Sequence, residues 1–313
     1  MTDGVKSPTP SARARWAFHS ERGSTFMLQL MTWISLRLGR RVGRAILYVI
    51  AAYFTLFAPR ATAASRNYLR RVLNRTPRHR NVFQHILTFA STIHDRVYLI
   101  NGQFQDFDIR ITGDAIIRRV ESQGQGCIIM GAHLGSFEMI RALGDQRQAS
   151  EVTLLMYEDN ARKINSMLAA INPGKHHDII SLGHVDSMLQ VRDRLERGAA
   201  VGVLADRSLD DDATVSVTFL GQPAAFPVGP FRMAAMLRCP VVFMAGIYIG
   251  GNRYEIYCED VADFSQTSPA ERDAAIRAAM IRYVAMVERH CRAYPYNWFN
   301  FFDFWRERAD SFS

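Results

Sequence analysis

The chain has 313 residues, of which 48% are apolar, and a formal net charge of +8. This length and composition exclude a disordered chain and allow a substantial core, as one large domain or two small ones. The charge is uneven, with a net of +13 in residues 1–120 and −5 in residues 121–313. The basic first third favours an anionic partner such as a phospholipid surface, a nucleic acid or an acidic protein.

The N-terminal region is predicted to be disordered over residues 1–24 and helical from about Thr25, and no secretory signal is evident. Residues 45–58 then form a run without a charged side chain, which ends at Pro59. Fourteen residues fall short of the ~20 that span a bilayer, but they suffice to enter one leaflet. The alternative is a buried core helix. In the membrane interpretation, anionic head groups would surround the preceding arginines, Arg37, Arg40, Arg41 and Arg44.

A second basic cluster follows, and it strengthens the membrane-surface interpretation. It consists of Arg60, Arg66, Arg70, Arg71, Arg75, Arg78 and Arg80. No nucleic-acid-binding motif accompanies these arginines, so no nucleic acid partner is expected. We therefore expect a basic helical membrane-associating region over residues 25–106, followed by an α/β domain over residues 107–313.

Beyond residue 107 the pattern alternates between apolar strands and amphipathic helices. Predicted strands cover residues 126–132, 152–157, 177–181, 199–205, 214–220, 240–249 and 253–259. Predicted helices cover residues 137–144, 160–170, 184–197, 229–238 and 268–291. This alternation predicts an α/β fold with a mostly parallel central sheet flanked by helices, and the last two strands are expected to form a hairpin.

His133 and Glu138 are the first candidates for chemistry. An apolar run ends at His133, turns through Gly135 and Ser136, and restarts at Phe137, which is typical of a strand, a tight turn and a helix capped by Ser136. A histidine at a strand end can meet a carboxylate in the next helix's first turn. The spacing alone is weak evidence, but α/β enzymes place their chemistry at such junctions.

Two more segments follow predicted strands and are expected at the same end of the sheet. Asp206 and Arg207 end one strand, and a Pro/Gly-rich loop over residues 219–230 leads into a helix. Asp206 and Arg207 could instead form an ordinary surface ion pair. The loop could instead serve only to start the next helix, with proline in its first turn.

In combination these motifs resemble a known family. His-x4-Glu after an apolar strand, then Asp-Arg, then Phe-Leu-Gly-x-Pro-Ala-x-Phe-Pro-x-Gly-Pro, is similar to the lipid A biosynthesis (late) acyltransferases of the glycerolipid acyltransferase superfamily. The resemblance covers roughly residues 25–305. It implies transfer of a fatty acyl group from acyl carrier protein or acyl-CoA to a hydroxyl of a membrane lipid or glycolipid. It also implies action at the cytoplasmic face of the inner membrane.

The resemblance suggests a role for each motif. His133 would be the general base and Glu138 would orient its imidazole. Amides around Leu134–Ser136 would stabilise the oxyanion. Arg207, or an arginine of the N-terminal region, would bind an acidic group on the acceptor. The residues expected to bind substrate are Gly135, Ser136, Asp206, Arg207, Phe226, Pro227 and Gly229.

Two features depart from the usual family pattern. Tyr157 is followed by Glu158, where the lipid A enzymes commonly carry arginine. The C-terminal residues 294–305 are unusually aromatic and look more like a branch associated with aryl polyene or other glycolipid clusters. The ordinary alternative for that stretch is aromatic core or membrane-interface packing.

Other function classes are less favoured. A metal-dependent hydrolase would need His176, His177, Asp178 and His184, but adjacent histidines on a strand point to opposite sides, so no metal site is expected. A non-catalytic protein that binds anionic membranes is the other alternative. The absence of Gly-x-Ser-x-Gly disfavours serine-hydrolase chemistry, and without a Gly-x-Gly-x-x-Gly or Walker loop no cofactor is expected. Four scattered cysteines are expected to be reduced thiols: Cys127, Cys239, Cys258 and Cys291.

Overall fold

The computed structural model describes residues 22–146, 152–158, 161–162, 165–166, 171–172, 178–182, 186–208 and 212–305. The predicted disordered N-terminus and most of the predicted helix 160–170 therefore lie outside the described residues. So do three histidines of the alternative metal site, namely His176, His177 and His184.

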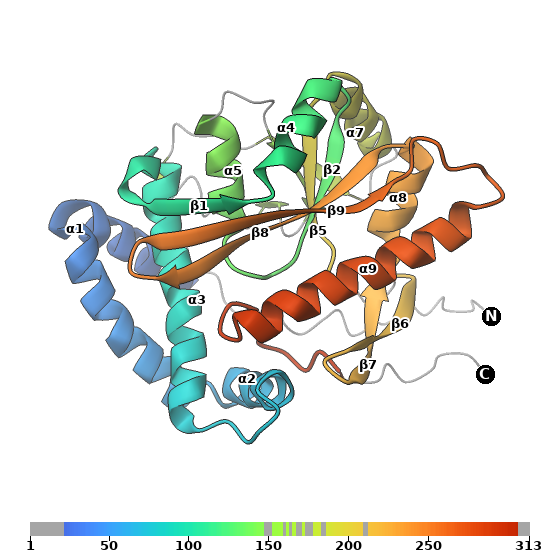
Figure 1. The fold of residues 1–313 in the computed structure, drawn as a ribbon. Coiled ribbons are helices and arrows are strands. Elements are labelled where there is room, and N and C mark those ends of the chain that lie inside the picture. The colour runs from blue at the N-terminus through green and yellow to red at the C-terminus, as the bar shows by residue number, and fades with distance from the viewer. Residues whose placement is uncertain are drawn as a thin grey trace, which may run out of the picture.

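A seven-stranded sheet forms the centre of the molecule, in the order β1-β9-β8-β2-β5-β3-β4 (Figure 1). All neighbouring pairs are parallel except β8 and β9, which form the expected antiparallel hairpin. The predicted α/β class with a mostly parallel sheet is confirmed. The strands are β1 (Asp108–Thr112), β2 (Cys127–Gly131), β3 (Val152–Tyr157), β4 (Ile179–Leu182), β5 (Ala200–Leu204), β8 (Pro240–Gly250) and β9 (Arg253–Asp263).

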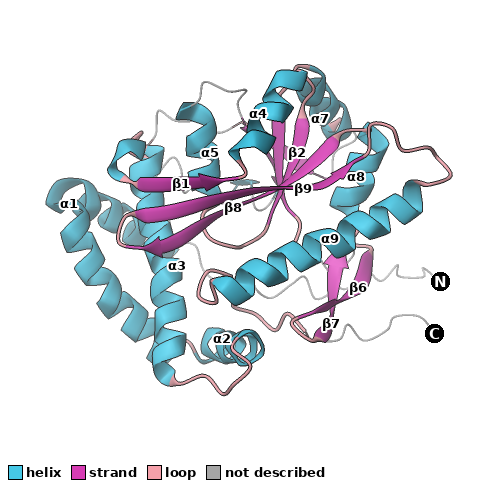
Figure 2. Ribbon diagram, in the orientation of Figure 1, coloured by secondary structure: helices cyan, strands magenta, loops and turns pink. Residues whose placement is uncertain are grey.

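Helices cover both faces of this sheet (Figure 2). The five buried residues of β2 alternate between two cores: Ile128 and Met130 join the side chains of α7, α8 and α9, whereas Cys127 and Ile129 join those of α4 and α5. The unbroken apolar run in β2 follows from this burial on both faces. These helices are α4 (Asp114–Gln123), α5 (Phe137–Gln146), α7 (Ser187–Glu196), α8 (Gly229–Leu237) and α9 (Arg272–Ala293).

Neither β1 nor α4 was predicted from the sequence. The strand β1 lies at the edge of the sheet, and its side chains alternate between exposed and half-buried. An edge strand that buries little apolar surface gives only a weak periodic signal in the sequence. Its parallel pairing with β9 is a long-range contact that local sequence does not indicate.

The Pro/Gly-rich segment 219–230 is not the loop that the sequence predicted. Residues 222–227 form the strand β7 (Gln222–Pro227), which pairs antiparallel with the predicted strand, β6 (Thr214–Phe219), before α8 begins. Leu220 and Gly221 connect the strands with φ of 49° and 81°, as a tight two-residue hairpin requires. The prolines concealed the strand because proline cannot donate a ladder hydrogen bond and is confined to edges.

In the described part of the chain three helices precede the sheet, namely α1 (Arg22–Phe57), α2 (Pro59–Val72) and α3 (His79–Ile100). The first is broken at Gly39, whose φ of 81° and ψ of 169° are not helical. α1 packs along α3, which packs on α5 and β8 (Figure 1). Among the described residues no single helix is long and apolar enough to cross a bilayer. The pair Thr32–Phe57 and Pro59–Val72, bent by 93°, meets the length and composition test together.

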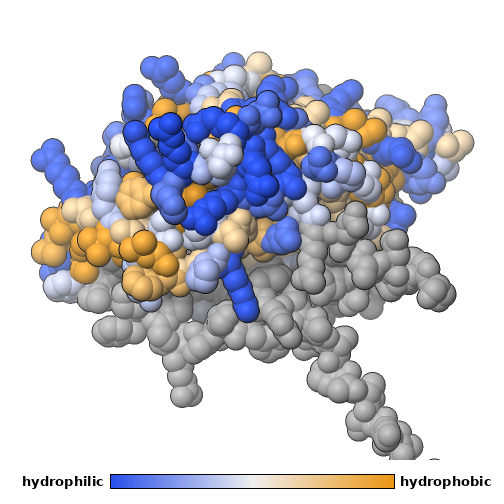
Figure 3. Space-filling view, turned by 90° about the horizontal axis from the view of Figure 1, so that it is seen from below, coloured by the Kyte–Doolittle hydropathy of each residue, from blue (hydrophilic) through white to orange (hydrophobic). Residues whose placement is uncertain are grey.

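The outward side of α1 is apolar. In its second half the buried positions include Gly43 and Ala51, and a Cβ at Gly43 would lie 2.2 Å from Nε2 of His94 on α3. The view from below shows apolar surface on the side where α1 lies in Figure 1 (Figure 3). An exposed patch of this kind marks an interaction surface. Its large side chains are Trp33, Leu36, Leu38, Val42, Tyr48, Val49, Tyr53, Phe54, Leu56 and Phe57.

Candidate functional site

His133 follows the end of β2, and the predicted strand, turn and helix are all present. Oγ of Ser136 accepts a hydrogen bond from the Met139 amide at 3.3 Å, as expected of a residue that caps α5. Gly135 has a φ of 70°, and a Cβ there would lie 2.1 Å from the carbonyl oxygen of Gly246. Only glycine fits at this position, so the turn that carries His133 is held against β8.

The imidazole of His133 is bound to Asp206, which follows β5. Nδ1 of His133 lies 2.8 Å from Oδ1 of Asp206, and the His133 amide donates to Oδ2 at 3.0 Å. The two residues meet because β2 and β5 are parallel neighbours that end together. An ionised carboxylate only accepts hydrogen bonds, so Nδ1 carries the hydrogen and Nε2 keeps its lone pair.

Two residues of the C-terminal segment complete the environment of Asp206. The indole Nε1 of Trp298 donates to Oδ2 at 3.1 Å, and Nδ2 of Asn300 donates to the same oxygen at 3.0 Å. Burial alone would raise the pKa of Asp206. The charge and hydrogen bond of His133, with the charge of Arg207 and the Asn300 bond, outweigh burial and hold that pKa well below its usual range.

The environment of His133 keeps its imidazole neutral. Burial and then the charge of Arg207 lower its pKa, and the opposing effect of Asp206 is smaller. The side chain is 27% exposed, and Nε2 has no hydrogen-bond partner among the described residues. A neutral imidazole with a free, accessible Nε2 is the form that a general base requires.

The expectation that Glu138 orients this imidazole is wrong, because Asp206 makes that contact. Oε1 of Glu138 instead accepts from Nε and Nη2 of Arg141 at 2.8 and 2.6 Å. Glu138 is buried in the first turn of α5. It lies near the half-buried Arg96 of α3, where its charge partly offsets the lowering of the Arg96 pKa by burial. Glu138 therefore belongs to an arginine-rich contact between α3 and α5.

Most of the expected oxyanion donors are used by the fold. The amide of Gly135 donates to the carbonyl of Asn297 at 2.8 Å, and that of Ser136 donates to the carbonyl of Gly246 at 2.7 Å. These bonds tie the His133 turn to β8 and to the C-terminal segment. Among the described residues the Leu134 amide makes no such bond, so it is the remaining candidate of the three.

Arg207 also serves the C-terminal segment. Its Nε donates to Oδ1 of Asn300 at 2.5 Å, Nη2 donates to the Phe299 carbonyl at 2.9 Å, and the guanidinium lies over the ring of Phe302. Burial lowers the pKa of Arg207 to about 10, so the group stays charged at neutral pH. Its charge lies beside His133, whereas its hydrogen bonds fix Asn300.

The other predicted substrate contacts have structural roles. Phe226 is fully buried against Phe219 and Phe304, and Pro227 is buried beside it, so the hairpin places both in the core. Gly229 is exposed at the start of α8. Asp206 is fully buried, and its hydrogen bonds go to His133, Trp298 and Asn300.

The aromatic C-terminal segment joins the N-terminal helices to the site. Nε2 of His85, on α3, lies 2.8 Å from the Trp298 carbonyl, and its Nδ1 lies 2.9 Å from Oγ of Ser65 on α2. Burial lowers the pKa of His85 to about 4, so this histidine is neutral. Sequence reasoning missed Trp298 and Asn300 as site residues, since nothing local distinguishes them within an aromatic run.

Asp95 on α3 is a second buried acid, and it corrects the prediction for the N-terminal arginines. Nε of Arg40 lies 3.0 Å from Oδ1 of Asp95, and Nη2 of Arg44 lies 2.6 Å from Oδ2. Of the four arginines expected among head groups, these two point into the protein. Arg37 and Arg41 are exposed.

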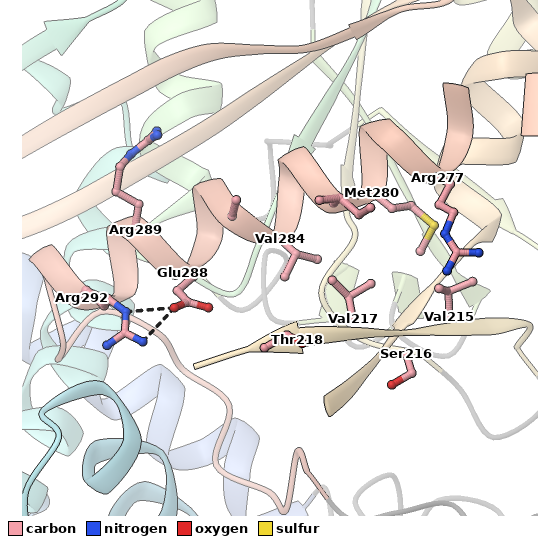
Figure 4. Close-up of a pocket in the computed structure, with 12 residues that line it drawn as sticks. Val215, Ser216, Val217, Thr218, Arg277, Met280, Val284, Glu288, Arg289 and Arg292 are labelled. Atoms are coloured by element: carbon pink, nitrogen blue, oxygen red, sulfur yellow. Dashed lines mark hydrogen bonds and ion pairs between the residues drawn. The ribbon is translucent and has the colours of Figure 1, made fainter. Parts of the chain in front are cut away.

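The described residues contain two notable hollows. A groove of about 740 Å³ lies between β6 and α9, with Val215, Val217, Met280 and Val284 along it and Arg277 at its rim (Figure 4). A cleft of about 550 Å³ lies between α1, α3 and the β8–β9 turn.

All four cysteines are buried thiols that form no disulfide with one another. Asp178, the described member of the alternative metal set, pairs with Arg194 at 3.0 Å and accepts from Oγ1 of Thr153 at 2.6 Å. Within the described ranges no three His, Cys, Asp or Glu side chains are grouped to hold a metal ion.

A histidine held against a buried carboxylate at the ends of parallel strands in an α/β fold is typical of enzymes that use acid–base chemistry. The chain belongs to the bacterial lipid A biosynthesis acyltransferase family, whose sequence profile it matches over residues 13–307. It is therefore an acyltransferase of the EC 2.3.1 class, in a family that transfers acyl groups to lipid A precursors at the inner membrane. A comparison with curated proteins found no match.

Proposed function

We propose that this chain transfers a fatty acyl group from an acyl carrier protein or CoA thioester to a hydroxyl of a membrane lipid or glycolipid, with His133 as general base. The observation that carries the proposal is the fixed imidazole. Its Nδ1 is held by Asp206 at 2.8 Å, its side chain is 27% exposed, and its Nε2 has no hydrogen-bond partner among the described residues.

The chemistry follows from this arrangement. Nε2 removes the proton of the acceptor hydroxyl while its oxygen attacks the thioester carbon. The tetrahedral intermediate collapses, the carbon–sulfur bond breaks, and the imidazolium returns the proton to the departing thiolate. Asp206 stabilises the imidazolium and keeps the ring in one tautomer, so no covalent acyl-enzyme is needed. The Leu134 amide is our candidate donor to the oxyanion.

In this proposal Glu138 does not orient the His133 imidazole, although the sequence predicted that role. Its carboxylate instead binds Arg141 and offsets positive charge near Arg96. Removing one partner of a buried ion pair leaves the other uncompensated. Loss of Glu138 would therefore displace these arginines and act on His133 indirectly.

The membrane assignment rests on α1. We propose that residues 25–106 form the membrane-associating region, that residues 107–313 carry the reaction, and that the protein lies on the cytoplasmic face of the inner membrane as a monotopic or peripheral enzyme. The apolar outer side of α1 would enter one leaflet. The exposed Arg37 and Arg41 would contact anionic head groups.

The acceptor is proposed as a class of lipid. The family implies a lipid A precursor. The aromatic C-terminus and Glu158 also fit a branch acting on an aryl polyene lipid or another glycolipid, and lipid analysis of a deletion strain separates the two. The lipid that disappears is the product.

The test uses purified protein, an acyl carrier protein thioester and candidate lipids. Free thiol should appear only when an acceptor is present, and His133→Ala should abolish its release. His290→Gln is the matched control, because His290 is also buried beside a carboxylate, Glu259, at 2.6 Å. Activity retained in folded His133→Ala protein would rule out the mechanism. A metal-dependent hydrolase would instead release thiol without acceptor and lose activity to a chelator.

A further inference from the structure

The cleft between α1, α3 and the β8–β9 turn is distinct from the His133 side chain, and its functional role is unassigned. The cleft is lined by Arg40 and Arg44 of α1 and by Gln84 and Thr88 of α3. Tyr248 of β8 also lines it. Arg40 and Arg44 are mostly buried, with side chains 23% and 18% exposed. Buried arginines in a hollow of this size require a chemical reason.

The cleft carries an uncompensated positive charge. Two guanidinium groups share one carboxylate, that of Asp95, which also accepts from the Tyr254 hydroxyl at 2.8 Å. Both arginines also donate to the Gly251 carbonyl, which is neutral. Among the described residues, the two N–H groups on Nη1 of Arg40 have no partner. A net charge of one remains, with free donors on a planar guanidinium suited to phosphate.

Tyrosine rings and polar side chains line the rest of the cleft. Tyr48, Tyr248, Tyr294 and Tyr296 all contribute to its walls. Such rings offer an apolar face and a hydroxyl tip, which together suit a polar head group attached to an apolar body.

The position of the cleft links the membrane side of the protein to the reaction site. Tyr48 belongs both to the cleft wall and to the exposed apolar side of α1. On the other side, the carbonyl of Asn297 in the cleft wall accepts from the Gly135 amide at 2.8 Å. The side-chain amide of Asn297 also brackets the backbone of Tyr248, at 2.9 and 3.1 Å. A head group in the cleft would thus lie between the bilayer and the His133 turn.

We propose that this cleft binds the phosphate of a lipid head group through Arg40 and Arg44. Where that lipid is the acyl acceptor, the inference rests on the function proposed above. The phosphate binding itself does not, because it needs no acyl transfer. The positive charge that Asp95 does not neutralise then attracts the phosphate, and the tyrosines surround the group that bears the phosphate.

Binding of the protein to phosphatidylcholine vesicles containing a minor fraction of phosphatidic acid tests the proposal. Arg40→Gln should weaken binding by about ten- to a hundred-fold, the value of a hydrogen-bonded charge. Gln84→Glu adds a negative charge at an exposed position of the wall and should also weaken binding, whereas Gln84→Lys should not. Arg41→Gln is the matched control, one residue along α1 but exposed and outside the cleft.

The outcomes separate cleanly. Loss with Arg40→Gln and Gln84→Glu but not with Arg41→Gln supports the cleft, and His133→Ala should bind like the parent protein. Competition by glucosamine 1-phosphate would then identify a phosphorylated sugar as the bound group, and its absence a bilayer phospholipid. Equal small losses for Arg40→Gln and Arg41→Gln would show diffuse attraction to the surface and overturn the proposal. Unchanged binding in Gln84→Glu protein would overturn it as well.

Discussion

Asp206 and Asp95 are both fully buried carboxylates, yet their surroundings differ in kind. Asp206 meets one titratable imidazole and two neutral donors, Trp298 and Asn300. Asp95 binds two permanently charged guanidinium groups and a tyrosine hydroxyl, and the imidazole of His94 lies further away, at 3.8 Å. The first carboxylate can therefore stabilise a charge that appears during a reaction. The second compensates a charge that is always present, which suits anchoring and binding.

Asp206→Asn should produce the largest effect and tests the first half of this comparison. The amide cannot stabilise an imidazolium, and it places a donor against the donors that now point at the carboxylate. We expect kcat to fall by about 10³–10⁴-fold, as for the equivalent change in a serine protease triad. Initial rates of thiol release, with circular dichroism as the fold control, measure it. A loss smaller than ten-fold would show that the imidazole does not depend on Asp206.

Asp95→Asn tests the second half. It leaves Arg40 and Arg44 without their carboxylate, and removing one partner of a buried ion pair costs about 3–5 kcal/mol. We expect the free energy of unfolding, measured by urea titration, to fall by that amount. Arg37→Gln, which changes an exposed arginine of the same helix, should leave it unchanged. Equal stabilities of the two variants would mean that Asp95 is not what holds α1 to α3.

His85 extends the comparison to a histidine that is neutral without a carboxylate. Burial lowers its pKa to about 4, so the unfolded chain binds more protons between that value and about 6.5. Stability should therefore fall by about 3 kcal/mol as the pH drops through this window. His85→Gln should lose that part of the pH dependence. Identical urea midpoints against pH in both proteins would place the His85 pKa close to its ordinary value.

Replacement of Arg207 should give the smallest effect, a shift in the pH dependence of kcat/KM that reports the pKa of His133. Its charge helps to lower the pKa of His133, and a general base works only when neutral. The acid limb of kcat/KM should lie below the ordinary histidine pKa of about 6.5 and should move to higher pH in Arg207→Gln. Arg207→Lys keeps the charge and should leave the limb in place. A shift in both variants would indicate loss of the Asn300 contact rather than of charge.

Local structure around the site could be predicted from the sequence. The strand that ends before His133 and the helix capped by Ser136 were both predicted, and both are present. Both are local features that depend on neighbouring residues. The β8–β9 hairpin and most helix bounds are of the same kind, because periodicity reports which face of an element is buried.

The errors share the opposite property. Glu138 was preferred as the partner of His133 because it is close in sequence, whereas Asp206 lies 73 residues further along the chain. The strand at residues 222–227 was predicted as part of a loop, because its two prolines hide the strand pattern. In the structure its Phe226 packs against Phe219 and Phe304. Arg40 and Arg44 resemble the exposed Arg37 in sequence and differ only in what α1 faces.

The sequence by itself determined the alternation of strands and helices, the parallel sheet and the histidine at the end of its central strand. Those features follow from apolar periodicity and turn chemistry within short windows. The tertiary structure alone decided which acid meets the imidazole, which amides stay free, and which arginines turn inward. Such choices depend on the order of strands in the sheet and on the docking of α3 and the C-terminal segment, and both bring together residues that no local pattern connects.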